Sequence, residues 1–291
     1  MRILVTGRHG QVASCLAEQA GAHELVFAAR PDFDLADPAS IERVIAGVRP
    51  DLIFSVAAYT AVDKAEDEPE LAMAINGTAP GVIGRAAAAI GAPVVHLSTD
   101  YVFDGSRDGA WREDDPVAPL GVYGATKLAG EVALAASGAR YAILRTAWVY
   151  SPFGNNFVKT MLRLAATRDE LNVVADQFGC PTSAIDIATA MLTVADAWAD
   201  PALPGADRIY HFAGSGETHW AGFAEAIFAE SARRGGASAR VVGIPSSGYP
   251  TKAKRPANSR LDSSAFADAF GYRAPDWRAS LGVVMARLPA A

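Results

Sequence analysis

Short apolar runs alternate with longer stretches of helical periodicity through the first half of the chain. The apolar runs predict strands at Arg2–Thr6, Glu24–Ala29, Asp51–Ser55, Pro93–Leu97 and Tyr141–Thr146. The stretches between them predict helices at Gln11–Ala20, Pro38–Gly47 and about Glu68–Ile90, and a fourth helix that carries Tyr123 and Lys127. Apolar strands separated by helices indicate a parallel sheet covered on both faces. We therefore predict an α/β fold with a doubly wound, Rossmann-type sheet.

Beyond about residue 150 this alternation loosens. Helices are still predicted at Asn156–Ala166, Ser183–Trp198, Trp220–Ser231 and Asp276–Arg287, but Pro and Gly interrupt the segments between them. We expect residues 1–150 to form an NAD(P)-binding Rossmann domain. Residues 151–291 are expected to form a smaller substrate-binding region, partly interwoven with the first, that closes a cleft above the strand ends.

A glycine-containing turn directly follows the first predicted strand. Gly7 permits a sharp turn, and Gly10 lets the backbone approach a pyrophosphate at the start of the next helix. Ala13 stands where the three-glycine form of this loop has its last glycine. The pattern alone is equally typical of an ordinary turn, but its place in a β-α-β unit favours a dinucleotide.

The residue after the second predicted strand bears on the choice of cofactor. It is Arg30, where an Asp or Glu would bind the adenosine ribose of NAD. Arg30 and Arg8 can meet a 2′-phosphate, which favours NADPH with NADH as the alternative, or both are solvated surface residues. Asp34 stands where the chain can contact adenine, and Asp37 is placed to cap the helix that starts at Pro38.

Tyr123 and Lys127 lie one helical turn apart, on one face of their predicted helix. The ammonium favours the phenolate and is expected to lower the pKa of Tyr123, which then acts as a general acid towards a carbonyl oxygen. Such a pair is by itself common on solvated helices. Ser98 and Thr99 end the fourth strand, where either hydroxyl can bind the same oxygen or cap the following turn.

Nine sequence blocks together resemble the dTDP-4-dehydrorhamnose reductase family, within the extended short-chain dehydrogenase/reductase superfamily. The blocks are Gly7–Gln11, Ala57–Glu66, Ser98–Gly105, Tyr123–Lys127, Arg145–Tyr150, Gly154–Val158, Asp176–Thr182, Tyr210–Gly214 and Arg255–Leu261. Ser55 and Val56 depart from the pattern, since the family usually has smaller or amide residues there. The blocks after residue 144 are the ones that indicate the substrate of this family, dTDP-4-dehydrorhamnose.

The resemblance implies reduction of the C4 keto group of dTDP-4-dehydro-L-rhamnose to dTDP-L-rhamnose. It makes Thr99, Tyr123 and Lys127 the catalytic triad and favours Thr99 over Ser98 by motif position. The predicted cofactor-binding residues are Gly7, Arg8, His9, Gly10, Gln11, Val12, Arg30, Asp34, Leu35, Ala57, Ala58, Tyr59, Tyr123 and Lys127. The predicted substrate-binding residues are Thr99, Asp100, Tyr101, Tyr123, Trp148 and Arg255. Two of these residues have an alternative interpretation. Trp148 is then a core side chain, and Arg255 is part of a solvated basic group with Lys252 and Lys254.

Two other functions stay open. The first is that the chain is a reductase or epimerase of another nucleotide-linked keto sugar. The second is that it is a non-catalytic regulatory subunit that binds nucleotide without turnover. The intact Thr99, Tyr123 and Lys127 argue against the second.

Composition narrows the partners. A net charge of −6 over 291 residues argues against nucleic-acid binding, and no apolar stretch is long enough to span a membrane, so we expect a cytoplasmic protein. Two cysteines are too few for a disulfide framework, and the five histidines have no metal-ligand spacing. We predict no catalytic metal. Some relatives carry Mg²⁺ at a dimer contact, so a homodimer fits the resemblance, but we assign no Mg²⁺ ligands.

Overall fold

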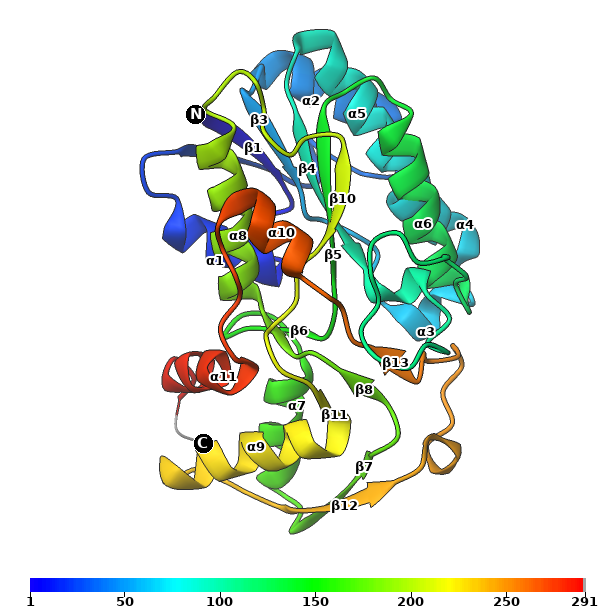
Figure 1. The fold of residues 1–291 in the computed structure, drawn as a ribbon, viewed down its shortest axis with the longest axis vertical. Coiled ribbons are helices and arrows are strands. Elements are labelled where there is room, and N and C mark those ends of the chain that lie inside the picture. Colours follow the sequence, from blue (N-terminus) through cyan, green and yellow to red (C-terminus); the bar gives the residue numbers. More distant parts are fainter. Residues whose placement is uncertain (290–291) are drawn as a thin grey trace.

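A computed structural model describes residues 1–289 and contains one six-stranded parallel sheet (Figure 1). The strand order is β10-β5-β4-β3-β1-β2. The strands are β1 (Arg2–Thr6), β2 (Glu24–Ala28), β3 (Leu52–Ser55), β4 (Val94–Thr99), β5 (Tyr141–Thr146) and β10 (Arg208–His211). The chain runs outward from β1 in one direction and then returns to add strands in the other. This order confirms the predicted doubly wound α/β fold.

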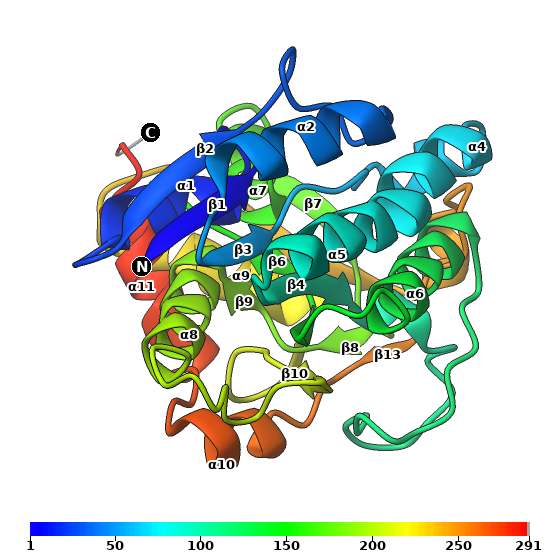
Figure 2. The same ribbon diagram turned by 90° about the horizontal axis from the view of Figure 1, so that it is seen from above.

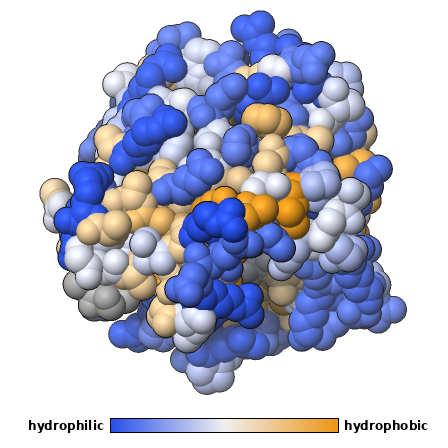
Figure 3. Space-filling model, turned by 90° about the horizontal axis from the view of Figure 1, so that it is seen from below, coloured by the Kyte–Doolittle hydropathy of each residue, from blue (hydrophilic) through white to orange (hydrophobic). Residues whose placement is uncertain are grey.

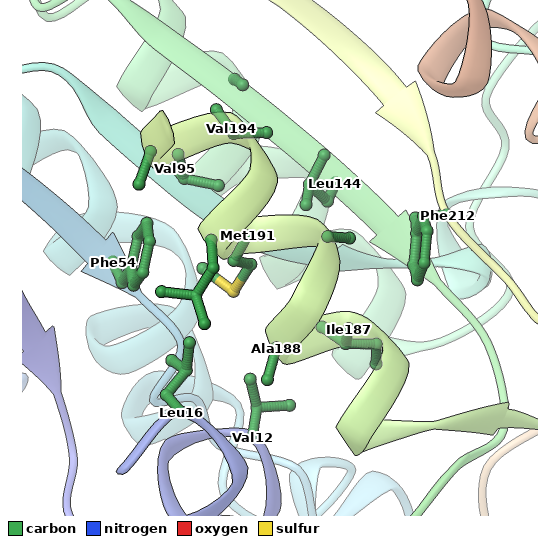
Figure 4. Packing of buried hydrophobic residues seen from close by; sticks show 14 of the residues in the cluster. Val12, Leu16, Phe54, Val95, Leu144, Ile187, Ala188, Met191, Val194 and Phe212 are labelled. Atoms are coloured by element: carbon green, nitrogen blue, oxygen red, sulfur yellow. The ribbon is translucent and has the colours of Figure 1, made fainter. Parts of the chain in front are cut away.

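Helices cover both faces of the sheet (Figure 2). One face is covered by α1 (Gln11–Gln19), α8 (Ala184–Ala197) and α10 (Ser264–Phe270), and the other by α2 (Pro38–Val48), α5 (Ala79–Ile90) and α6 (Val122–Ala135). Figure 4 shows the core of the first face, where Met191 and Ala188 of α8 pack towards Phe54 and Leu16. The Asp37 side chain accepts a hydrogen bond from the Ala39 N–H and caps α2, as predicted.

The predicted helix over Glu68–Ile90 is helical but not uniform. It consists of α4 (Pro69–Ala72), a π-helical segment, η1 (Met73–Thr78), and α5, and it is preceded by the short α3 (Val62–Ala65). Within η1 the buried Asn76 turns its side chain towards the loop after β3, where it accepts from the Tyr59 N–H and donates to the Tyr59 carbonyl. The wide turn thus ties this helix to the end of β3.

The remaining elements form a lobe at the carboxyl ends of the strands (Figure 1). Its helices are α7 (Phe157–Ala165), α9 (Trp220–Arg233) and α11 (Trp277–Ala286), and β7 (Glu170–Val174) pairs with β12 (Arg240–Ile244). Its two-residue strands are β6 (Val149–Tyr150), β8 (Phe178–Gly179), β9 (Thr182–Ser183), β11 (Thr218–His219) and β13 (Asn258–Ser259). Two 3₁₀ turns complete the structure, η2 (Asp100–Val102) after β4 and η3 (Ser246–Gly248) after β12. Seen from the side of this lobe, a short strip of strongly apolar side chains lies among polar ones (Figure 3).

The two halves of the sequence share the main sheet. The strand β10 pairs in parallel with β5, so the sixth strand comes from beyond residue 200. The helix α8 covers β1, β3 and β4 together with α1, and α10 packs beside it. The sequence patterns predicted neither β10 nor α10. Within residues 1–289, no helix has the length and apolar character needed to cross a membrane.

Candidate active site

Two cavities lie at the carboxyl edge of the sheet and share part of their lining. One has a volume of about 430 Å³ and the other about 700 Å³. Gly7, His9, Gly10, Ala57 and Ala58 line both, so the two cavities meet along the turns after β1 and β3. Doubly wound sheets place their ligands at this edge.

The glycine turn forms the shared wall. Gly7 has a φ of +83°, and a Cβ atom added there would lie 3.2 Å from the Ala57 Cβ. Gly10 precedes the first residue of α1, so the free N–H groups of that helix face the cavities. Every residue predicted to bind the cofactor lines one or both cavities.

Gln11 ties this turn to the second half of the chain. Its Oε1 accepts hydrogen bonds from the Ser151 hydroxyl at 2.9 Å and from the Asn156 amide at 3.0 Å. Gly154 and Asn155 therefore line the same cavity as the glycine turn, although neither was a predicted site residue. The block Gly154–Val158 carried that signal.

The larger cavity has the charges expected of an adenosine end. Arg8, Arg30, Asp34 and Leu35, all predicted to bind the cofactor, line it. Lys64, which was not a predicted site residue, also lines it. Lys64 pairs with Glu68 at 2.8 Å, and Glu68 also accepts from the Tyr59 hydroxyl at 2.6 Å.

The smaller cavity leads to Tyr123 and Lys127 in α6. Gly124 lets this helix lie close to η2, because a Cβ atom there would be 2.1 Å from the Tyr101 carbonyl oxygen. The half-buried Tyr123 lies beside the Thr99 side chain, and its ring meets the Tyr101 ring edge-on with the ring centroids 5.4 Å apart. The motif residues of β4 and α6 are thereby brought together.

The expected lowering of the Tyr123 pKa is not found. Removal of the phenol from water raises its pKa, and the neighbouring Thr99 hydroxyl offsets this only in part. The Lys127 ammonium is directed elsewhere, because its Nζ donates to the Leu97 carbonyl at 2.6 Å and lies 3.2 Å from His96 Nε2. Burial lowers the pKa of Lys127 to about 8.

Ser98 and Thr99 have separate partners. Ser98 Oγ donates to Glu131, whose carboxylate pairs with Arg145 at 2.7 Å in the interior. Thr99 Oγ1 donates to Asp100 at 3.1 Å and accepts from the Tyr101 N–H at 3.2 Å. The Thr99 hydroxyl therefore caps η2 and lies beside Tyr123, while its predicted binding of a substrate oxygen stays a prediction.

Asp100 and Arg255 lie beside this group. Burial raises the pKa of Asp100 to about 6, and its Oδ2 has no hydrogen-bond partner among residues 1–289. Arg255 pairs with Asp63 at 2.5 Å and donates to the Tyr101 hydroxyl at 3.1 Å. The loop that holds Arg255 is thus joined to α3 and, through Tyr101, to Tyr123.

Trp148 lies apart from this group, between two fixed neighbours. Its ring stacks on that of Trp220, with the centroids 3.5 Å apart, and a Cβ atom added to Gly179 would be 2.5 Å from the indole. Its φ of +50° is unfavourable for a large side chain. Trp148 is half-buried, so its ring packs against these neighbours and keeps an exposed part that can contact a ligand.

A metal-binding group is absent from the part of the chain that the structure describes, residues 1–289. No three His, Cys, Asp or Glu side chains there lie close enough together to hold an ion.

Comparison with known proteins adds a family to this geometry. Residues 1–289 match the family model described as the RmlD substrate binding domain. A dTDP-4-dehydrorhamnose reductase of Sinorhizobium fredii is 48% identical over 281 residues, which cover 96% of this chain and 95% of that protein.

Solved structures agree with this match. A dTDP-4-dehydrorhamnose reductase of Clostridium acetobutylicum is 35% identical, with a TM-score of 0.91 over 98% of this chain and 99% of that one. The Bacillus anthracis dTDP-4-dehydrorhamnose reductase, solved in complex with NADP, is 32% identical, with a TM-score of 0.89 over 98% of both chains.

Proposed function

The chain belongs to the dTDP-4-dehydrorhamnose reductase family, and we propose that it reduces the C4 keto group of dTDP-4-dehydro-L-rhamnose to give dTDP-L-rhamnose. One observation carries the proposal. Tyr123 and Lys127 both line the smaller cavity at the end of β4, and the Tyr123 phenol lies there beside Thr99. Three groups then lie around the position proposed for the substrate oxygen. Tyr123 is the proton donor, the Thr99 hydroxyl orients the oxygen, and Lys127 is the cation.

The residues around the two cavities fit a dinucleotide. The positive φ of Gly7, the start of α1 and the small side chains Ala57 and Ala58 suit a pyrophosphate and a nicotinamide lying against backbone. Arg8 and Arg30 suit a 2′-phosphate, so we assign NADPH as the cofactor, with NADH as the alternative. When bound here, the reduced nicotinamide supplies the hydride that reaches C4 of the sugar.

Tyr123 gives its proton to the C4 oxygen as negative charge develops there. The phenol is fully protonated at neutral pH, and the negative charge that develops on the C4 oxygen draws its proton. Thr99 orients the same oxygen by a hydrogen bond. The Lys127 ammonium holds a ribose hydroxyl of the cofactor and stabilises the phenolate once the proton has left.

In our proposal the substrate lies between the end of β4 and the lobe. Asp100, Tyr101 and Arg255 are assigned to it because they connect directly to Thr99 and Tyr123. Trp148 is assigned to the sugar because Trp220 and Gly179 hold its ring in a fixed place. Residues 1–150 supply the assigned cofactor contacts and most of the assigned substrate contacts, and the second half of the chain adds Arg255. A homodimer and a cytoplasmic location stay predictions.

The test is oxidation of NADPH by the purified protein with dTDP-4-dehydro-L-rhamnose, followed at 340 nm, with identification of the sugar product. UDP- and GDP-linked 4-keto sugars serve as competing substrates. Faster turnover of one of these would favour a reductase or epimerase of another nucleotide sugar. Binding of NADPH with no oxidation by any of them would favour the regulatory subunit.

A further inference from the structure

A buried histidine lies behind the Tyr123–Lys127 pair. His96 in β4 is 1% exposed, and its Nε2 is 3.2 Å from Lys127 Nζ. Its Nδ1 is 3.0 Å from the hydroxyl of Ser55 in β3. Ser55 and His96 are register partners in the sheet, so the chain Ser55–His96–Lys127 crosses from the sheet to α6 inside the protein.

The Lys127 ammonium has three N–H donors to place. The Leu97 carbonyl oxygen accepts one at 2.6 Å, and His96 Nε2 accepts a second. Lys127 also lines the smaller cavity, so its third N–H is left for a group bound there. The two acceptors within the protein therefore decide where the third proton points.

His96 can accept from Lys127 only as a neutral imidazole. An imidazolium would carry a proton on Nε2, which would then face the ammonium as a second donor. Burial and the charge of Lys127 hold the pKa of His96 well below its usual value. With the Nδ1 proton directed to Ser55, the lone pair on Nε2 is free for Lys127.

We propose that His96 is a positioning residue for the reduction, fixed by Ser55 through one ring nitrogen and orienting the Lys127 ammonium through the other. The inference rests on the proposed function, because that function assigns Lys127 to the cofactor ribose and to Tyr123. It adds to the site a residue from the middle of the sheet that touches neither cavity.

Glu131 and Tyr123 of α6 are further titratable groups near Lys127. Glu131 lies one turn further along α6, and its negative charge opposes the lowering of the Lys127 pKa by burial. Its carboxylate accepts hydrogen bonds from Arg145 and Ser98 and not from the ammonium. Glu131 is instead paired with Arg145 of β5, and Tyr123 lies one turn before Lys127. Loss of the His96 acceptor therefore removes one of two hydrogen bonds from the ammonium and leaves the charges unchanged.

The test compares two amides at position 96. In His96→Gln the amide oxygen reaches the place of Nε2 and accepts from Lys127, whereas the shorter amide of His96→Asn reaches only the place of Nδ1. The dissociation constant of NADPH is measured by nucleotide fluorescence from pH 6 to 10, and kcat for the dTDP-keto sugar over the same range.

We expect His96→Gln to stay within about threefold of the wild type. His96→Asn should bind NADPH about tenfold more weakly, because a hydrogen bond to a charged group is lost. In His96→Asn the alkaline limbs of the NADPH-binding profile and of the kcat profile should move about one pH unit lower, since the ammonium loses an acceptor. Ser55→Ala keeps His96 but removes a partner of Nδ1, and should move the limbs in the same direction by less.

Val95→Ala is the matched control for lost packing, because Val95 adjoins His96 in β4 and is buried in the opposite core. It should lower the melting temperature without moving either limb. Equal profiles for the Gln and Asn variants would overturn the positioning role. If the wild type binds NADPH but reduces no keto sugar, the proposed function fails, while the binding profiles still decide the role of His96.

Discussion

The Thr99 side chain lies beside the Tyr123 phenol, and this contact joins the end of β4 to the first turn of α6. Neither residue is placed by its own element alone. The contact requires α6 to approach η2 closely, which Gly124 permits. The chemistry of the site therefore depends on how these two elements pack.

Tyr123→Phe removes the proton donor and keeps the ring. We expect kcat to fall roughly 10²–10⁴-fold, the usual contribution of a positioned general acid, while NADPH binding stays within about threefold. Steady-state kinetics and fluorescence titration measure the two effects. An active Phe variant would show that the proton comes from another group.

The activity should depend on the ionisation of Lys127. Its pKa of about 8 lies below the usual 10.5, so the ammonium persists below pH 8 and is lost above it. We therefore expect kcat/KM to be level near pH 7 and to fall about tenfold for each unit well above pH 8. A profile that stays level to pH 10 would argue against a role for the ammonium.

Arg30 should discriminate between the two cofactors. Arg30→Ala removes a cation from the wall of the larger cavity and should raise the KM for NADPH about tenfold. The KM for NADH should hardly change, because NADH has no 2′-phosphate. Parallel increases in both constants would show that Arg30 acts on the adenosine in general.

Arg255 should act on the substrate and not on the cofactor. Arg255→Ala also removes the cation that pairs with Asp63, and we expect the substrate KM to rise about tenfold or more. Lys252→Ala is the control in the same loop, since Lys252 forms an exposed pair with Asp67 and should have little effect. The assignment fails if the substrate KM of the Arg255 variant is unchanged.

The approach of α6 to η1 should limit what position 130 accepts. A Cβ atom on Gly130 would lie 2.1 Å from the Asn76 carbonyl oxygen, so Gly130→Ala should destabilise the fold by about 1–3 kcal/mol. Gly282→Ala in α11 meets no atom within 4 Å and should stabilise it by up to about 1 kcal/mol. Denaturant unfolding measures both, and equal effects would contradict the packing argument.

Sequence patterns predicted the parts of the fold that local rules decide. Five strands of the main sheet are apolar runs between helices, and their predicted ends lie within two residues of the observed ones. The strand β10 was missed because it is short, begins with Arg208 and follows a segment with Pro and Gly. The π-helical turn at Asn76 was missed because its partner Tyr59 comes from another loop.

The site divides in the same way. The glycine turn and the residues of α6 stand in recognisable motifs, so the sequence indicated them. His96 occurs in an apolar strand where a buried histidine is a usual core residue, and nothing in the spacing relates it to Lys127. The direction of the Tyr123 pKa shift depends on burial and on where the Lys127 ammonium points, and both are properties of the packed structure.

The place of β10 in the sheet has a consequence for biosynthesis. A ribosome that has released only the first 150 residues has delivered five strands, but β5 is still an open edge and the face that α8 covers is still bare. Such an edge pairs readily with other chains. The nascent chain therefore remains vulnerable to aggregation until residue 211 has left the exit tunnel, and chaperone binding should be concentrated in that interval of translation.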